Sequence, residues 1–338
     1  MKWMRRTIAL LVLLACALLG ALVVTAQHPA KPVGFQLGRA IDQDGRSFPV
    51  GIWYPTTAST SLTFLGAGFI YLARDAPVAG TGLPMVLVSH GNAGGPTSHT
   101  DLALALASAG YVVAAPMHPG DNYADQRSEG TVPWLSARSA QMRRTADYML
   151  TQWRDHAAID PQRIGAFGFS AGGITVLTAI GATPDLRRIA SHCATTPEFI
   201  CDVLRTFKSP LMDPAKAQAG NTWFPDQRIK AAVLAAPGLA FTLGPDAFDN
   251  VHIPIQLWSG AIDHVVPDAT NSAIVRKGLA ANVDYHSVAG AGHYAFLAPC
   301  GLLAPPAICN DEGHFDRKAF HALMNASVIA FFNAQSTR

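Results

Sequence analysis

One serine lies between two glycines in a segment whose pattern is typical of nucleophilic catalysis. The segment reads Gly168-Phe169-Ser170-Ala171-Gly172, and it fits the G-x-S-x-G motif that joins a strand to a helix. An apolar run ends at Phe169 and a helical pattern extends from Ala171 to Ile180. In open α/β folds such a turn projects the hydroxyl at the edge of the sheet where ligands bind. We therefore predict Ser170 as a nucleophile; the alternative is a structural serine in a glycine-rich turn.

A serine hydroxyl becomes a good nucleophile only when a base takes its proton. The chain has twelve histidines, so position must select one. His293 follows the Gly/Ala loop 289–292, which comes after the last predicted strand. His286 falls inside that strand and His314 lies beyond the loop, so structural or surface roles suit them better. We predict His293 as the base.

An acid must hold the imidazole in the correct tautomer and stabilise its protonated form. Asp263 lies in the loop after the predicted strand 255–258. Asp268 better suits the first turn of the following helix, where a negative charge is favourable, and Asp284 lies in the last strand. The chain order Ser170, Asp263, His293 is the order of α/β hydrolases.

Backbone N–H groups are predicted to bind the oxyanion that would develop during catalysis. The loop 89–95 follows the first parallel strand and reads Ser-His-Gly-Asn-Ala-Gly-Gly. We predict the backbone N–H groups of Asn92 and Ala171 as its donors, each contributing a few kcal/mol, about 2.7–4, to the transition state. His90 is expected to orient this loop by hydrogen bonds rather than to act in catalysis.

Apolar runs and helical patterns alternate along the chain and must position these loops. Continuous apolar runs suggest strands that are buried on both faces, joined by helical crossovers. The sequence predicts an α/β fold of the α/β-hydrolase type, with a mostly parallel central sheet and helices on both faces. Expected strands are 33–41, 47–54, 85–88, 111–115, 164–169, 229–235, 255–258 and 283–288, the first two antiparallel, and expected helices are 100–108, 136–154, 171–180, 268–281 and 317–332.

The segment 182–227 interrupts this alternation. It holds five prolines and two cysteines but no clear core strand. We interpret it as an insertion over the ends of the strands, serving as a lid; the alternative is a surface excursion without a functional role. The remaining chain from residue 27 to 338 is expected to form one domain.

Four cysteines remain beyond residue 26, and their spacing favours two local disulfides, Cys193–Cys201 and Cys300–Cys309. Four cysteines allow three pairings, and buried free thiols are the alternative. No CxxC pair or HExxH spacing is present, so no metal site is expected.

The first 26 residues are typical of an export signal. Lys2, Arg5 and Arg6 precede an apolar run up to Val24, and small residues around Ala26 favour cleavage before Gln27. An uncleaved membrane anchor formed by residues 7–24 is the main alternative, because the run nearly suffices to span a bilayer. A lipobox ending at Cys16 is a third. We expect an exported protein, periplasmic or secreted, with membrane association only through this segment.

Charge gives no indication of a nucleic-acid partner. The formal net charge of +2 becomes 2 − 3 = −1 once the three basic residues of the leader are removed. A near-neutral chain without blocks of like charge lacks the electrostatic footprint of nucleic-acid binding. The oligomeric state is not determined by these observations.

Several motifs together resemble the dienelactone-hydrolase-like branch of α/β hydrolases, in particular exported proteins related to platelet-activating-factor acetylhydrolase. They are Val50-Gly51-Ile52-Trp53-Tyr54-Pro55, Val88-Ser89-His90-Gly91, Met117-His118-Pro119-Gly120-Asp121, Arg163-Ile164-Gly165, the segment around Ser170, and Gly290-Ala291-Gly292-His293. The resemblance implies hydrolysis of carboxylic esters without a metal or organic cofactor. It also implies Asn92 and Ala171 as the oxyanion donors. Dienelactone hydrolases proper use a cysteine nucleophile, so Ser170 argues against dienelactone as the substrate.

The expected function is a serine esterase that acts on a small-molecule or lipid ester through an acyl-enzyme. The alternatives are a lipase or phospholipase A2-type enzyme, an acyltransferase, and a non-catalytic binding module on the same fold. Phe169, Trp134, Tyr294 and Phe296 are expected either to contact an acyl group or to pack in the core.

Overall fold

The computed structural model describes residues 26–218, 222–280, 283–301, 303–313 and 315–335, with a few positions before residue 26. The expected leader, its alternative as an anchor and the lipobox at Cys16 fall mostly outside the described residues. Within the described part, no helix combines the length and apolar character needed to cross a membrane.

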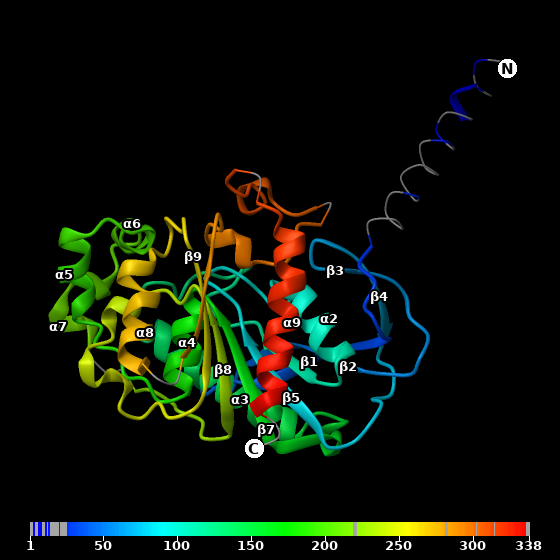
Figure 1. Cartoon of the computed structure of the whole chain (residues 1–338), viewed down its shortest axis with the longest axis horizontal. Helices are drawn as coiled ribbons and strands as arrows, with labels where there is room; N and C mark the ends of the chain where they lie inside the picture. The colour runs from blue at the N-terminus through cyan, green and yellow to red at the C-terminus, as the bar shows by residue number, and fades with distance from the viewer. Residues whose placement is uncertain are drawn as a thin grey trace.

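A ten-stranded sheet runs through the molecule in the order β10-β9-β8-β7-β5-β6-β2-β1-β4-β3 (Figure 1). The strands from β6 to β10 in this order are parallel to their neighbours, which confirms the predicted mostly parallel sheet. Their bounds are β5 Leu83–Ser89, β6 Val112–Pro116, β7 Ile159–Phe169, β8 Ile229–Ala235, β9 Ile255–Gly260 and β10 Val283–Val288. All overlap the strands predicted from the sequence, although β7 begins five residues before the expected 164–169.

The N-terminal strands are mainly antiparallel. β1 (Val33–Ile41) pairs antiparallel with β2 (Ser47–Pro55), as predicted, across a turn in which Gly45 adopts φ 81°. β2 then pairs antiparallel with β6. The strands β3 (Ser61–Leu65) and β4 (Gly68–Arg74) were not predicted. They form a short hairpin at the sheet edge whose partly exposed residues give no continuous apolar run, so sequence pattern alone does not separate them from a loop.

Helices cover both faces of the sheet. α2 (Thr100–Ser108) and α9 (Arg317–Gln335) pack against each other and against one face. α3 (Trp134–Thr151), α4 (Ala171–Ala179) and α8 (Ser272–Leu279) pack into the core on the other face. The helix predicted over 268–281 is shorter than expected, because a 3-10 turn at Asp268–Thr270 is separated from α8 by the non-helical Asn271.

The segment 182–227 forms short helices, with no strand among its described residues. They are α5 (Arg188–Thr195), α6 (Phe199–Thr206) and α7 (Pro214–Ala217), joined to the core through Ile189, Leu204 and Leu211. The disulfide Cys193–Cys201 links α5 to α6, and Cys300–Cys309 closes a loop before α9. Both predicted cysteine pairs are therefore present in the structure.

Candidate active site

Ser170 occupies the turn between β7 and α4 in a strained backbone conformation. Its φ of 54° with ψ of −119° lies outside the regions that L-residues usually adopt. A Cβ on Gly168 would lie 2.1 Å from the carbonyl oxygen of Gly172, and one on Gly172 would lie 2.1 Å from that of Ser89. Glycine is therefore required at both positions for the strand, the turn and the helix to pack. Backbone strain of this kind is concentrated at functional sites.

The three residues predicted as nucleophile, base and acid lie in hydrogen-bonding contact. His293 Nδ1 lies 2.8 Å from Asp263 Oδ2, and His293 Nε2 lies 2.9 Å from Ser170 Oγ. Both His293 and Asp263 are buried. Since the carboxylate accepts a hydrogen bond from Nδ1–H, Nε2 is left free to accept the serine proton. This geometry is the one required for a base that activates a serine.

Two backbone N–H groups fix the orientation of the Asp263 carboxylate. Asp263 Oδ1 accepts hydrogen bonds from the N–H of Val265 at 2.9 Å and of Val266 at 2.7 Å. Its other oxygen is thereby directed to His293. The loop after β9 thus supplies both the acid and the groups that hold it.

The alternative histidines and acids lie elsewhere in the described structure. His286 stacks on Trp258 and pairs with Asp284 at 3.0 Å, within β10. Asp268 accepts a hydrogen bond from the Tyr285 hydroxyl at 3.0 Å. His314 lies outside the described residues. The contacts of His286, Asp284 and Asp268 are those of structural groups.

The loop 89–95 runs beside Ser170, as the oxyanion prediction requires. A Cβ on Gly91 would lie 3.4 Å from the Cβ of Ser170. Among the described residues, no protein acceptor is found for the backbone N–H groups of Asn92 and Ala171. Two unpaired donors next to a serine can bind a negatively charged oxygen.

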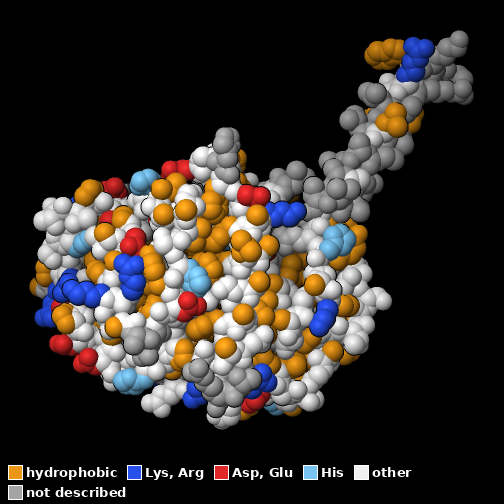
Figure 2. Space-filling view, in the orientation of Figure 1, with side chains coloured by type: hydrophobic (Ala, Val, Ile, Leu, Met, Phe, Trp, Pro, Cys, Tyr) orange, Lys and Arg blue, Asp and Glu red, His pale blue; other side chains and the backbone are white. Residues whose placement is uncertain are grey.

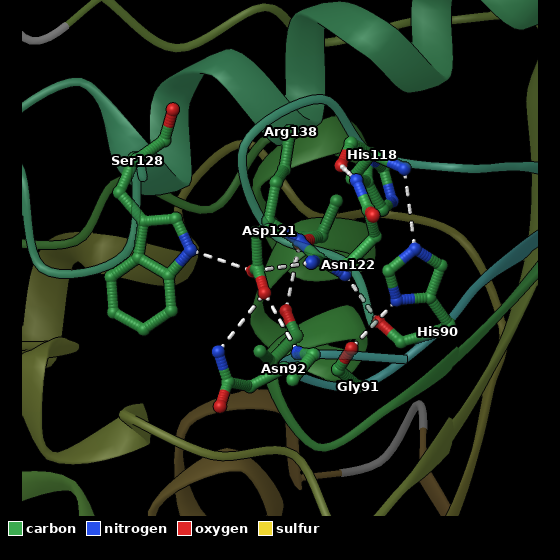
Figure 3. Close-up of polar contacts among 12 residues, drawn as sticks. His90, Gly91, Asn92, His118, Asp121, Asn122, Ser128 and Arg138 are labelled. Carbon is green, nitrogen blue, oxygen red and sulfur yellow. Dashed lines mark hydrogen bonds and ion pairs between the residues drawn. The ribbon is translucent and has the colours of Figure 1, made fainter. Parts of the chain in front are cut away.

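A buried carboxylate that sequence reasoning missed holds this loop (Figure 3). Asp121 Oδ1 accepts from the Asn92 side-chain amide at 2.9 Å and from the Ala93 N–H at 2.8 Å. Asp121 Oδ2 accepts from the Trp134 indole N–H at 2.6 Å. Ala93 has a φ of 52°, a conformation that is costly for alanine. Asp121 therefore stabilises a strained loop next to the proposed oxyanion donors.

Arg138 pairs with Asp121 and contacts the start of the same loop. Its guanidinium lies 2.6 Å from Asp121 Oδ2, with both side chains 1 % exposed. It also donates to the Ser89 hydroxyl at 3.2 Å and to the His90 carbonyl oxygen. Burial alone would raise the pKa of the Asp121 carboxyl, but the Arg138 charge and the surrounding donors hold that pKa below its ordinary value. The pair is therefore ionic inside the protein.

His90 and His118 are buried beside this pair and stay neutral. Burial, reinforced by the positive charge of Arg138, lowers the pKa of His90 to about 3 and that of His118 well below its ordinary value. His90 Nδ1 donates to the Gly91 carbonyl oxygen at 2.6 Å, and Nε2 accepts from the His118 N–H at 3.2 Å. These contacts orient the loop, as expected for His90. The motif Met117–Asp121 carried the family resemblance, but nothing in its sequence assigned a role to Asp121.

Most of the aromatic residues considered for substrate contact are core residues. Trp134, Phe169 and Phe296 are all at most 3 % exposed, so packing explains them, whereas Tyr294 is partly exposed. A surface hollow of about 490 Å³ beside Pro55 and Gly110 lies at the opposite edge of the sheet from Ser170. Within the described ranges, no group of three His, Cys, Asp or Glu side chains is arranged to hold a metal ion.

Comparisons with known proteins agree with this architecture. Residues 70–212 match the model of the dienelactone hydrolase family; this range includes Asn92 and Ser170 but ends before Asp263 and His293. Ferulic acid esterase from Streptomyces cinnamoneus is structurally similar, with a TM-score of 0.60 and 18 % identity over 92 % of this chain and 93 % of that one. A Mycobacterium tuberculosis puromycin-hydrolyzing peptidase gives a TM-score of 0.54 and 17 % identity over 89 % of this chain, which spans 39 % of the peptidase. At these identities the likeness concerns the fold. No curated protein matches the sequence.

Proposed function

We propose that this chain, which has the α/β-hydrolase fold and whose residues 70–212 match the model of the dienelactone hydrolase family, is a serine esterase that cleaves carboxylic esters. The observation that carries the proposal is the contact chain from Ser170 through His293 to Asp263, at 2.9 and 2.8 Å. The strained turn at Ser170 and the free N–H groups of Asn92 and Ala171 support it.

The proposed reaction is acyl transfer in two steps. His293 takes the Ser170 proton as the oxygen attacks the ester carbonyl carbon, and Asp263 stabilises the imidazolium. The N–H groups of Asn92 and Ala171 bind the oxyanion. His293 then gives the proton to the leaving alcohol. Water, activated by the same histidine, hydrolyses the acyl-serine, and Ser170 regains its proton.

A series of p-nitrophenyl esters from acetate to palmitate tests this proposal, with the wild type beside Ser170→Ala. We expect turnover by the wild type and none by the variant, with both proteins folded by circular dichroism. If neither protein acts on any ester, the interpretation as a non-catalytic binding module takes its place.

The same series separates the related activities. An increase in rate above the critical micelle concentration would favour a lipase or phospholipase, and transesterification with added methanol would favour an acyltransferase. A ferulate ester and an aminoacyl amide are useful additions, because the structural neighbours are a ferulic acid esterase and a peptidase.

We also propose that 182–227 acts as a lid beside this site. Glu198, at the start of α6, accepts hydrogen bonds from Thr270 and Asn271, in the loop that follows Asp263. On the other side, the Ser209 hydroxyl donates to the Gly130 carbonyl oxygen in the segment that follows Asp121. Phe199 on α6 is 48 % exposed. If the segment is a lid, Phe199→Ser should change the preference for acyl-chain length; an unaltered preference argues for a simple surface excursion.

Export is proposed from the leader sequence and is supported by the two disulfides, which persist in oxidising compartments. The described charges on the face in Figure 2 are dispersed among apolar and neutral side chains. Sequencing the N-terminus of the protein recovered outside the cytoplasm would test the predicted cleavage before Gln27. A retained leader would favour the membrane anchor.

A further inference from the structure

A second carboxylate–imidazole pair, in which the imidazole is buried and the carboxylate is partly buried, lies behind the proposed base, and the reaction above does not use it. His321, on α9, places Nδ1 2.6 Å from Asp101 Oδ2 and Nε2 2.8 Å from the carbonyl oxygen of Ala295. His321 is 2 % exposed. Ala295 belongs to the short 3-10 turn His293–Phe296, which begins with the proposed base. The pair therefore contacts the backbone that carries His293.

The hydrogen-bond partners of His321 determine whether each of its ring nitrogens donates or accepts. A carbonyl oxygen can only accept, so Nε2 must carry a proton. Burial alone would raise the pKa of the Asp101 carboxyl, but the adjacent His321 and the Asn325 amide lower it below its ordinary value. An ionised Asp101 also only accepts, so Nδ1 carries a proton too. His321 therefore donates from both ring nitrogens, to the Asp101 carboxylate and to the Ala295 carbonyl oxygen.

The contacts that start at Ala295 and pass through His321 end at Asp101, which lies near the loop 89–95, called the oxyanion loop below. Asp101 is in the first turn of α2, which begins six residues after Gly94. The Ala298 N–H also donates to the Ser98 carbonyl oxygen at 3.1 Å. Thus the His293 turn and the segment that continues the oxyanion loop are joined twice, once by a backbone hydrogen bond and once through the Asp101–His321 pair.

We propose that Asp101 and His321 are positioning residues that fix the His293 turn relative to the oxyanion loop. A buried charge-assisted hydrogen bond is about twice as strong as a neutral one, and it holds a backbone segment more firmly than packing alone. The base must stay within hydrogen-bonding distance of Ser170 while the N–H of Asn92 faces the same carbonyl. The expected effect on kcat rests on the proposed esterase function. The expected effect on the structure of the His293 turn does not.

His321→Leu tests the proposal, because it removes both donors and retains an apolar side chain of moderate size. We expect kcat for p-nitrophenyl acetate to fall by about tenfold or more, since small misplacements of a catalytic group are costly, with KM changed by less than about twofold. The rate at which a fluorophosphonate labels Ser170 should fall in parallel. Amide hydrogen exchange in residues 292–298 should increase, because the Ala295 carbonyl oxygen loses its connection through His321 to Asp101 on α2.

Asp101→Asn is the conservative companion. The introduced side-chain amide can donate to Nδ1 of a neutral His321, so both hydrogen bonds of the imidazole remain, while the charge and the bond that Asn325 Nδ2 donates to the same oxygen at 2.7 Å are lost. We expect a smaller fall in kcat, about threefold, and a smaller rise in exchange. If His321→Leu does not fold, kcat and hydrogen exchange of Asp101→Asn test the positioning role instead.

Tyr111→Phe is the matched control. The Tyr111 hydroxyl donates to Asn333 Oδ1 at 2.7 Å, so its loss removes this hydrogen bond from the same helix at the end far from His293. We expect unchanged kcat and unchanged exchange in 292–298, even if thermal stability falls. The proposal is wrong if the His321 and Asp101 variants alter exchange in this turn no more than the control does. That measurement also separates it from the proposed function: if the wild type hydrolyses no ester, the exchange of 292–298 still tests the positioning role.

Discussion

At the scale of single residues, the contact between Asp263 and His293 makes a specific kinetic prediction. Asp263→Asn keeps the size of the side chain, but its amide oxygen would stay with the Val265 and Val266 N–H groups, so its NH2 group would face His293 Nδ1 as a donor. We expect kcat to fall on the order of 10³-fold or more, because the imidazole loses the tautomer that accepts the serine proton. Asp268→Asn is the control, since that carboxylate bonds Tyr285 instead, and ester hydrolysis by both variants is the measurement. Equal activity of the two variants would remove Asp263 from the mechanism.

Asp121 is expected to affect both stability and rate. Asp121→Asn leaves the buried Arg138 without a counter-charge, and breaking such a pair costs about 3–5 kcal/mol. The asparagine amide has only one acceptor oxygen, so it cannot accept both from the Ala93 N–H and from Trp134 and Arg138; the loop is held less firmly, and kcat should fall as well. Urea unfolding and ester hydrolysis measure the two effects.

Asp125→Asn is the control for Asp121. Asp125 lies in the same segment, but its partner Arg127 is 73 % exposed, and exposed ion pairs contribute at most about 1 kcal/mol. Similar losses in the two variants would mean that burial of the ionic pair is not what holds the loop.

At the scale of elements, the crossing of α4 and the end of β5 depends on Gly172. Gly172→Ala would place a methyl group 2.1 Å from the Ser89 carbonyl oxygen, so backbone atoms must move. We expect a destabilisation of about 3 kcal/mol, measured by thermal or urea unfolding. Gly292→Ala is the control, because open space surrounds that position and its φ is −88°. A Gly172 variant as stable as the control would contradict the close approach.

The two disulfides close loops of nearly equal size, with separations of 8 and 9 residues. Replacing either pair by serine should cost about 2.5 kcal/mol through loop entropy. Only the pair 300 and 309 lies just after the His293 turn, so only its loss should also lower kcat for a short ester. Differential scanning calorimetry and p-nitrophenyl acetate hydrolysis distinguish the two variants. A loss of rate from the 193/201 pair alone would reverse this assignment.

At the scale of the whole molecule, buried histidines make the protein sensitive to acid. Burial lowers the pKa of His99 to about 4 and that of His90 to about 3, whereas an unfolded histidine has a pKa of about 6.5. Below pH of about 6.5 the unfolded chain binds protons that the folded chain does not. The free energy of unfolding is therefore not reduced by these histidines above that pH. It falls as the pH is lowered further, by up to about 1.4 kcal/mol per pH unit for each histidine.

His99→Met should remove one such contribution. We expect a weaker pH dependence of the urea midpoint between about pH 6 and 4.5, because methionine does not titrate. His252, which is exposed, provides the control variant His252→Met, for which the wild-type dependence should persist. An unaltered slope in His99→Met would show that this histidine does not contribute to the acid sensitivity.

The sequence predicted the structure correctly where a local pattern of residues determines the element. Continuous apolar runs predicted the strands from β5 to β9, since buried parallel strands have no polar face to interrupt them, whereas β10 at the sheet edge is partly exposed and carries Asp284, His286 and Ser287. The two cysteine pairs were predicted from spacing alone. The edge hairpin β3–β4 was not predicted, because its residues are half exposed. The helix predicted over 268–281 was too long, because Asn271 interrupts it: the Asn271 side chain accepts a hydrogen bond from the Ala240 N–H, a contact that the local sequence does not indicate.

The sequence by itself determined the candidates Ser170, Asp263 and His293, because the glycines around the serine and the chain order of the three loops are local properties. Only the tertiary structure decided which polar and charged side chains hold those loops. Asp121 with Arg138, and Asp101 with His321, lie 17 and 220 residues apart in the chain. A carboxylate and its partner have no spacing rule when different elements carry them, so their pairing depends on how the helices pack against the sheet.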